Sequence, residues 1–261
     1  MSKGDASSGP KSPPGLREIE AASVRSWPAP ETVAIDGWLW RYASGGSLRA
    51  NSVATLAFHG SDVDAAIREA ERRYRERGAP CRFTICGVSE PGDLDARLAA
   101  MGYARGADHV TMAKAIGGSG IAGPGVAAPA DVELAAEAKP EWLAIYLAGL
   151  TPGRRAAAPA LLAGLPAQRA YFSCRRGGEV VGSGLSVADG PLASIQCMAT
   201  LAAVRRLGCA RSILAAIEAW AAVQGCTHLY LQAEAANAGA IALYEGVGFR
   251  VAGQYHVQTK D

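Results

Sequence analysis

The stretch NAGAIALYEGVGF, residues 237–249, is the most informative part of this sequence. Its small and apolar residues predict a helix over 238–247. Upstream of it, residues 205–211 read RRLGCAR between a predicted strand over 192–200 and a predicted helix over 210–224. The two segments lie on either side of one predicted helix and the strand that follows it.

The RRLGCAR segment has the chemistry of an anion-binding site. The start of a helix presents free backbone N–H groups and the positive end of the helix dipole. Gly208 and Ala210 are small enough to let an anion approach those groups, and arginines on both sides add positive charge. Taken alone, the segment predicts either a phosphate cradle or a solvated basic helix cap.

Together the two segments resemble the GNAT superfamily of N-acetyltransferases, over roughly residues 131–261. The pyrophosphate loop of that family, R/Q-x-x-G-x-G/A, appears as Arg205, Gly208 and Ala210. Its second signature, N-x-x-A-x-x-L-Y-E-x-x-G-F, appears as Asn237, Ala240, Leu243, Tyr244, Glu245, Gly248 and Phe249. One departure is Ala202, where the family often has a proline.

The resemblance implies that acetyl-CoA is the cosubstrate and assigns residues to it. Tyr244 would lie near the thioester sulfur and protonate the departing thiolate, for which a phenol with a pKa near 10 is a reasonable acid. The alternative is that Tyr244 is a packed aromatic residue. The implied cofactor-binding residues are Met198, Ala199, Thr200, Arg205, Arg206, Leu207, Gly208, Cys209, Ala210, Arg211, Asn237, Ala240 and Tyr244.

The expected chemistry is direct attack of an amine on the thioester in a ternary complex. Alkyl amines are mostly protonated at neutral pH, so a base or a water chain must remove the proton. Glu234 is the first candidate for this base, although the same position suits a residue that orders the loop or caps the next helix. Asp189 is a weaker candidate.

The two halves of the chain match each other in order and spacing, which indicates a tandem duplication. Residues 53–57 (VATLA) resemble residues 198–202 (MATLA), and helices of similar length end at Gly78 and Gly225. We therefore predict an α/β protein of two tandem GNAT-type domains, each a mixed, mostly antiparallel sheet flanked by helices. The predicted organisation is a disordered tail (1–15), a degenerate domain (16–116), a Gly/Ala/Pro-rich linker (117–130) and a catalytic domain (131–261).

The N-terminal half lacks the coenzyme signatures. Its counterpart of the arginine loop is shorter and places Asp62 and Asp64 at the helix start, where they would repel a pyrophosphate. No asparagine matches Asn237. We expect this half to have lost the coenzyme and to help line an acceptor site instead, although core packing explains its tryptophans equally well. The candidate acceptor-binding residues are Trp40, Arg49, Asn51, Trp142 and Tyr146.

The predicted function is transfer of an acetyl group from acetyl-CoA to a primary amine of a small molecule. The alternatives are a protein lysine or N-terminal acetyltransferase and a non-catalytic acetyl-CoA-binding regulator; Tyr244 favours an enzyme. Arg154 and Arg155 lie in the region where such proteins build acceptor pockets, so they suit either an anionic acceptor or a solvated loop. The sequence does not name the acceptor.

Composition narrows the partners and the location. A net charge of +2 gives no basis for a nucleic-acid or membrane partner. The 6 cysteines form no CxxC pair and only 4 histidines are present, so we expect no metal. With no apolar leader or long apolar run, we expect a soluble cytoplasmic protein. The oligomeric state is open, and a homodimer is one arrangement that the sequence allows.

Overall fold

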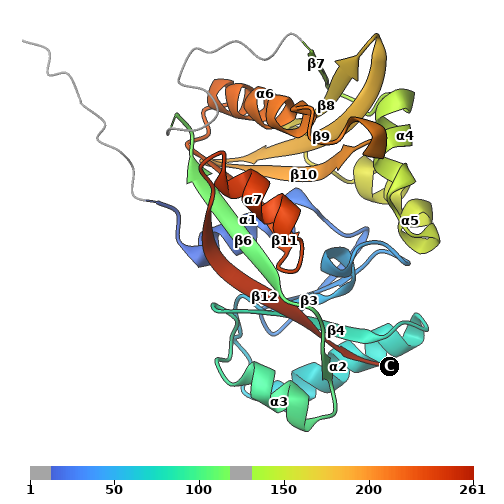
Figure 1. Ribbon diagram of the computed structural model, residues 1–261. Helices are drawn as coiled ribbons and strands as arrows, with labels where there is room; N and C mark the ends of the chain where they lie inside the picture. The colour runs from blue at the N-terminus through green and yellow to red at the C-terminus, as the bar shows by residue number, and fades with distance from the viewer. Residues whose placement is uncertain (1–12, 118–130) are drawn as a thin grey trace, which may run out of the picture.

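The computed structural model describes residues 13–117 and 131–261, and its strands form one continuous mixed sheet (Figure 1). Most of the predicted tail and linker lie outside the described residues. The first half contains α1 (Leu16–Ser26), β1 (Glu31–Ile35), β2 (Trp38–Tyr42), the short 3₁₀ helix η1 (Leu48–Asn51), β3 (Val53–Ala54), α2 (Val63–Glu76), β4 (Cys81–Cys86), α3 (Leu94–Ala100), β5 (Ala104–Arg105) and β6 (His109–Ala115). The second half contains β7 (Val132–Ala135), α4 (Pro140–Ala148), α5 (Pro152–Ala163), β8 (Arg169–Arg176), β9 (Glu179–Asp189), β10 (Leu192–Thr200), the 3₁₀ turn η2 (Ala202–Val204), α6 (Cys209–Val223), β11 (His228–Glu234), α7 (Ala238–Glu245) and β12 (Arg250–Lys260).

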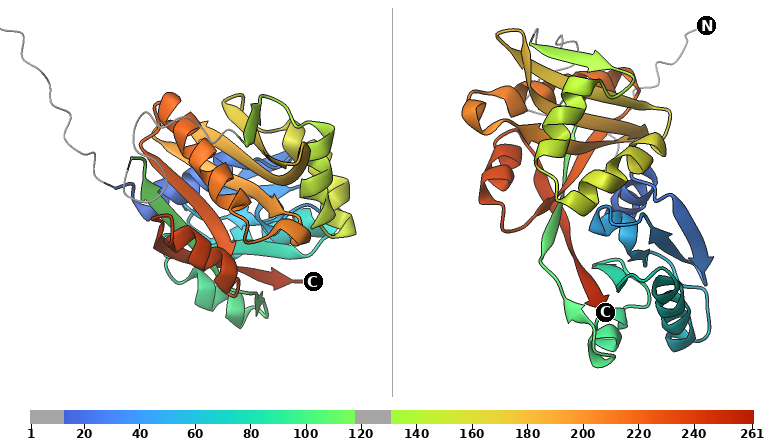
Figure 2. Two further views of the ribbon diagram at one scale, coloured as in Figure 1. Left: turned by 45° about the horizontal axis from the view of Figure 1, so that its top comes forward. Right: turned by 90° about the vertical axis from the view of Figure 1, so that its right-hand side faces the viewer.

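The two halves exchange their last strands. The sheet order is β1-β2-β3-β4-β12-β6-β11-β10-β9-β8-β7, with β5 paired to β12. Thus β6, from the first half, pairs antiparallel with β11, and β12, from the second half, pairs antiparallel with β4. The two exchanged strands also pair with each other. Both run from one half into the other in Figure 2, so neither half closes its sheet without the other.

Each half has the same arrangement at its centre. Among the described strands, every pairing is antiparallel except β3 with β4 and β10 with β11. Each of these parallel pairs is joined by a crossover helix, α2 or α6, as parallel strands require. The recurrence of this unit agrees with the predicted duplication and with the predicted mixed, mostly antiparallel sheet.

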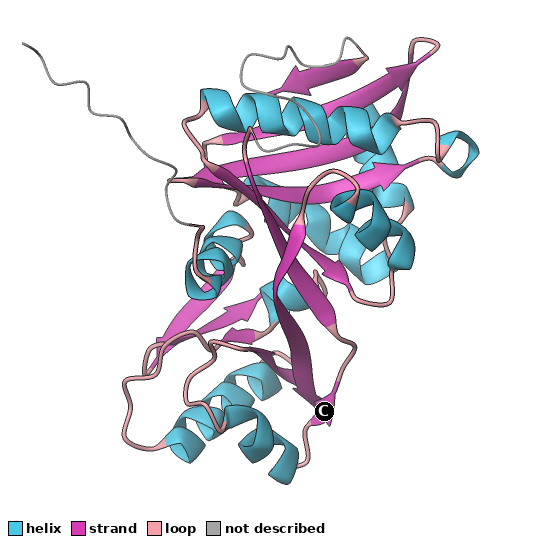
Figure 3. Ribbon diagram, turned by 60° about the vertical axis from the view of Figure 1, so that its left-hand side comes forward, coloured by secondary structure: helices cyan, strands magenta, loops and turns pink. Residues whose placement is uncertain are grey.

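Helices cover the sheet on both faces (Figure 3). In the second half α6 packs on one face and α4 on the other, and β9 lies between them. Glycines allow the close approach of α6: a Cβ at Gly184 would lie 2.5 Å from Ile213 Cγ2, and one at Gly182 would lie 2.3 Å from Cys209 Sγ. In the first half, α2 and α3 cover one face through a core around Trp38, Trp40 and Phe83.

Helix α1 lies between the two halves. Although it belongs to the first half in sequence, it packs on β9 and β10 of the second half. Ile19 and Ala22 form a buried cluster with Leu192 of β10 and Tyr230 of β11. The sequence analysis did not predict this helix, whose position depends on contacts with residues far away in the chain.

The second-half elements agree with their predicted positions apart from their ends. The strand predicted at 192–200 has those bounds, and α6 begins and ends one residue before the predicted helix. Strand β12 begins at Arg250 and spans both halves. The sequence analysis missed β7 and α5; α5 contains an internal proline, Pro159, which argues against a helix when only local sequence is considered.

Candidate active site

The strands β10 and β11 separate at the centre of the second half. Their parallel pairing ends at Ile195 and Leu231. Beyond that point β10 continues to Thr200 alongside β9, while β11 continues to Glu234 alongside β6. Among the described strands, none therefore pairs with the edge of β10 that faces β11 over its last residues, which include Met198, Ala199 and Thr200. An extended ligand can pair with such an edge as an added strand would.

A bulge in β10 lies at this point of separation. The register with β9 shifts between Gln196 and Ala199, and Cys197 has a φ of 52°, which is unusual for a residue other than glycine. On the other side of the bulge, Trp142 Nε1 of α4 donates to the Gly184 carbonyl at 2.9 Å. Helix α4 is thus bound to β9, the strand that pairs with the bulged part of β10. Burial raises the pKa of the Cys197 thiol to about 12, so it remains protonated and is not a nucleophile.

The RRLGCAR segment forms the loop that enters α6. Gly208 is the N-cap with a φ of 87° and offers no side chain to cap the helix, and the first turn has no acidic residue. The N–H groups of that turn are therefore open to an anion. Arg205 and Arg206 are exposed beside it. Arg211 reaches the end of α7, because a Cβ added to Gly246 would lie 3.3 Å from Arg211 Nη2.

Helix α7 places Tyr244 beside this region. Asn237 is the N-cap of α7, and its Oδ1 accepts the Ala240 N–H at 3.1 Å. The Tyr244 ring packs edge-on against Phe249, and its hydroxyl forms no hydrogen bond to a described residue. Burial raises the pKa of Tyr244 to about 12. The hydroxyl therefore keeps its proton at neutral pH and is a weaker acid than an exposed tyrosine.

The corresponding features of the first half are occupied by its own chain. After the last parallel pair of β3 and β4, the Thr55 carbonyl accepts the Glu90 N–H at 2.7 Å, and Thr55 Oγ1 bonds Ser89 Oγ at 2.7 Å. The start of α2 is capped by Asp62, whose Oδ1 accepts the Ala65 N–H at 2.9 Å. In the described part of the first half, the strand edge at Thr55 and one N–H at the start of α2 are thus bound by the chain itself.

Two of the five candidate acceptor residues lie near the separated strands. Arg49 Nη1 donates to Gln232 Oε1 of β11 at 3.1 Å, and its guanidinium lies 5.8 Å from the centre of the Trp27 ring. Tyr146 of α4 lies near enough to Cys197 that each group affects the pKa of the other. These two residues reach the site from different halves of the chain.

The other three acceptor candidates are structural in their contacts. Trp40 is 1% exposed and packs with Tyr74 in the first-half core, on the face that α2 covers. Asn51 holds its own turn, because its Oδ1 accepts the Ala43 N–H and its Nδ2 donates to the Ser47 carbonyl. Trp142 is fully buried under β9. None of the three lines the pocket between the halves that is described below. The contacts of the two tryptophans are packing contacts, and those of Asn51 are hydrogen bonds within its own turn.

The candidate bases differ in their surroundings. Glu234 is exposed at the end of β11, and its side chain forms no hydrogen bond to a described residue. Strand alternation places it on the same face as Tyr230 and Gln232, toward the first half. Asp189, by contrast, is bound by Arg25 at 2.8 Å, away from the separated strands. Glu234 therefore stays the better placed of the two.

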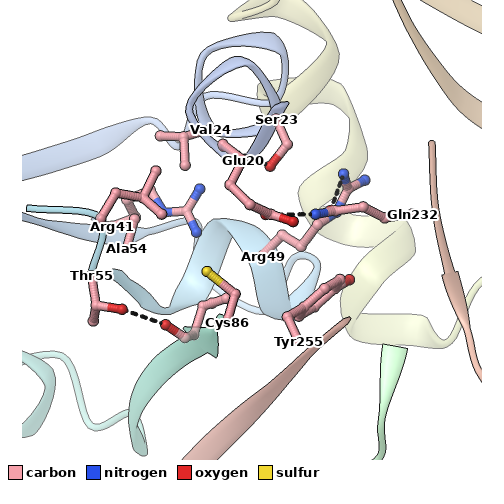
Figure 4. A pocket seen from close by; sticks show the side chains of 12 residues that line it. Glu20, Ser23, Val24, Arg41, Arg49, Ala54, Thr55, Cys86, Gln232 and Tyr255 are labelled. Carbon is pink, nitrogen blue, oxygen red and sulfur yellow. Dashed lines mark hydrogen bonds between the residues drawn. The ribbon is translucent and has the colours of Figure 1, made fainter. Parts of the chain in front are cut away.

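The sequence analysis missed several polar residues between the halves. A narrow pocket there is lined by Glu20 of α1, Arg41 of β2, Gln232 of β11 and Tyr255 of β12, together with Arg49 (Figure 4). These residues come from elements spread over the whole chain, and no local motif joins them. Glu20, a charged residue type on the buried face of α1, is a signal in the sequence that points to the pocket.

Fold and site together define an N-acetyltransferase of the GNAT class. A family described as "Probable histone acetyltransferase Rv0428c C-terminal" matches residues 14–257, and the chain belongs to this family. An "Uncharacterized N-acetyltransferase YobR" of Bacillus subtilis (strain 168) is 27% identical over 248 residues, which cover 94% of this chain and 98% of that protein. The protein is thus an acyltransferase.

Solved structures show the same fold over nearly the whole chain. A GCN5-related N-acetyltransferase from Kribbella flavida has a TM-score of 0.67 and 17% identity, covering 94% of this chain and 96% of its own. A tandem GNAT protein from the clavulanic acid biosynthesis pathway has a TM-score of 0.60 and 14% identity, covering 97% and 90%. The tandem GNAT arrangement predicted from the sequence agrees with this second structure.

Two features are absent from the described residues. No helix there is long and apolar enough to cross a membrane. Within the same residues, no three or more His, Cys, Asp or Glu side chains gather in a way that suits a metal ion.

Proposed function

We propose that this protein transfers the acetyl group of acetyl-CoA to a primary amine of a small molecule, by direct attack of the amine on the thioester in a ternary complex. The observation that carries the proposal is the combination of the free β10 edge, the uncapped and arginine-flanked start of α6, and the unbonded Tyr244 hydroxyl. All three features belong to the second half of the chain.

The coenzyme would occupy the separation with its pyrophosphate on the start of α6. There the N–H groups of the first turn and the side chains of Arg205, Arg206 and Arg211 would bind the phosphate oxygens. The pantetheine arm would pair with the β10 edge at 198–200, which ends beside the Cys197 bulge. Asn237 Oδ1 accepts a hydrogen bond from its own helix, and its Nδ2 would be free to donate to the coenzyme.

The acceptor amine would approach from the side that faces the first half. Glu234 and Gln232 lie on that face of β11, and Arg49 and Tyr146 reach it from η1 and α4. In this reaction the amine nitrogen bonds the thioester carbonyl carbon and loses a proton to Glu234, directly or through water. The carbon–sulfur bond then breaks, and Tyr244 gives its proton to the departing thiolate of CoA. Holding both reactants in the separation supplies much of the rate acceleration.

A thiol-release assay with acetyl-CoA and a panel of amines tests this proposal. We expect release that depends on a small amine and one bound acetyl-CoA per chain by calorimetry, because the first half has no free strand edge or helix start. Two sites of similar affinity, or no transfer to any small amine, would contradict it.

A protein acceptor is the competing possibility, since the description of the matching family names a histone acetyltransferase. The same assay with a lysine-rich histone tail peptide separates the two. The placement of the candidate acceptor residues between the halves favours a small acceptor over a peptide. Transfer to the peptide but to no small amine would replace the small-molecule proposal.

A further inference from the structure

The pocket between the two halves contains two arginines without a carboxylate partner. Arg41 is 3% exposed, and its guanidinium bonds only Ser52, through Nε to the carbonyl at 3.1 Å and through Nη2 to Oγ at 3.4 Å. Arg49 bonds only the Gln232 amide. Among residues 13–117 and 131–261, no carboxylate oxygen lies within 4.0 Å of either guanidinium.

A buried cation without a counter-ion costs stability, so its presence needs a reason. Burial, followed by the charge of Arg49, lowers the pKa of Arg41 to about 10, which still leaves it protonated at neutral pH. The 18 ion pairs of the described residues include most of the other arginines on the first-half sheet and helices, so carboxylates are available in this fold. Arg41 and Arg49 have no carboxylate partner among the described residues, and both side chains line the same pocket.

The one carboxylate in the pocket is held by neutral groups. Glu20 Oε1 accepts Thr111 Oγ1 at 2.5 Å, and Glu20 Oε2 accepts Gln232 Nε2 at 2.9 Å. Burial raises the pKa of Glu20, although its hydrogen bonds and the charges of Arg49 and Arg41 act in the opposite direction. The Gln232 amide therefore joins Glu20 on one side to Arg49 on the other (Figure 4). The pocket contains two arginines and one buried carboxyl group, Glu20.

The pocket adjoins the separation of β10 and β11. Gln232 follows Leu231, the last residue of β11 that pairs with β10. The charge of Arg49 acts on the Cys197 thiol at the β10 bulge, and the charges of Arg49, Arg41 and Glu234 all act on the Tyr255 hydroxyl. An anion bound by the arginines would therefore lie beside the place where the proposed base and thioester meet.

We propose that Arg41 and Arg49 bind a carboxylate of the acceptor, so that the substrate is a primary amine that also carries a carboxylate group, as amino acids do. The inference rests on the proposed function for its amine. The planar guanidinium of arginine matches the two oxygens of a carboxylate, and each such bond is stronger than a neutral one. A substrate of this kind supplies the counter-ion that the pocket lacks.

Binding measurements test the site without relying on catalysis. Calorimetry in the presence of CoA would compare α- and ω-amino acids with their neutral amides. We expect at least one amino acid to bind about tenfold or more tightly than its amide, since a charge-assisted bond is worth that much. Arg41→Gln and Arg49→Gln should each remove most of this preference and change the affinity of the amide less than about twofold. Arg68→Gln, on the exposed face of α2, is the matched control and should change neither affinity.

The outcomes separate this inference from the proposed function. Acetyl transfer to amines with equal kcat/KM for acids and amides would overturn the inference and leave the function standing. Arginine-dependent binding of amino acids without acetyl transfer would support the inference and overturn the function. A preference that survives in Arg49→Gln, whose half-exposed side chain can be replaced with little risk to folding, would overturn the inference even if Arg41→Gln does not fold. Preference for a phosphate-bearing amine alone would also overturn it.

Discussion

Lys114 Nζ lies 3.0 Å from Glu218 Oε2, and both side chains are almost fully buried. Lys114 belongs to β6, the strand that the first half contributes to the second-half sheet, and Glu218 belongs to α6. The second carboxylate oxygen, Oε1, accepts the Gly117 N–H at 3.1 Å. This ion pair therefore fastens the exchanged strand to the helix whose start forms the proposed pyrophosphate site.

Lys114→Met should lower the free energy of unfolding by about 3–5 kcal/mol, because it leaves the Glu218 carboxylate buried without its cation. The double variant Lys114→Met with Glu218→Gln should lose clearly less, since the glutamine keeps an acceptor for Gly117 and carries no charge. Chemical denaturation of the three proteins measures both effects. Equal losses in the single and double variants would mean that the pair is not energetically coupled.

Replacing Arg205 and Arg206 together by glutamate should weaken acetyl-CoA binding strongly while the fold survives. Both side chains are exposed, so folding does not depend on them, and each charge-assisted phosphate contact is worth on the order of 1.5–3 kcal/mol. Calorimetric titration measures the change. Arg68 and Arg75 of α2, both replaced by glutamate, provide a control with the same change of net charge. Unchanged affinity in the loop variant would place the pyrophosphate elsewhere.

Tyr244→Phe should slow the acetyl-transfer step by about 100- to 10,000-fold, the usual range for loss of a general acid. The phenyl ring keeps the packing on Phe249, so acetyl-CoA affinity should hardly change. Single-turnover transfer with a saturating acceptor measures the chemical step even where product release limits turnover. A rate within about twofold of the wild type would show that Tyr244 only packs.

Glu20→Gln should alter how stability depends on pH. Burial raises the pKa of Glu20 in the folded protein, with Arg41, Arg49 and Tyr255 as its charged or titratable neighbours from other elements. A carboxyl with a raised folded pKa stabilises the fold below its unfolded pKa, and this contribution is lost as pH rises through the folded value. The wild type should therefore lose more stability than Glu20→Gln as pH rises from about 4 to neutrality.

Unfolding free energies measured across that pH range check the Glu20 prediction. The difference between wild type and Glu20→Gln isolates one carboxyl from all the others that titrate. Glu18→Gln, an exposed glutamate on the same helix, serves as the control and should follow the wild-type curve. Curves for Glu20→Gln and the wild type that run parallel would contradict the raised pKa.

Local sequence was enough to predict the elements around the candidate coenzyme site. A helix start that needs Gly208 at a positive φ, flanked by arginines, and a helix that begins at Asn237 are both written in consecutive residues. Helix α5 shows the limit of such reasoning, because it continues through Pro159, where tertiary packing of its buried alanines and leucines outweighs the local cost of the proline.

The sequence by itself determined the class of protein, the mixed sheet and the succession of strands and α-helices from β8 to β12, because each of these depends on residues close together in the chain. Only the tertiary structure decided that β6 and β12 change places and that α1 packs on the opposite half. It also decided which polar residues meet: Glu20, Arg41, Arg49, Gln232 and Tyr255 come from five elements and share one pocket. Such contacts arise from hydrophobic burial and strand pairing over long separations, which leave no periodic or local pattern in the sequence.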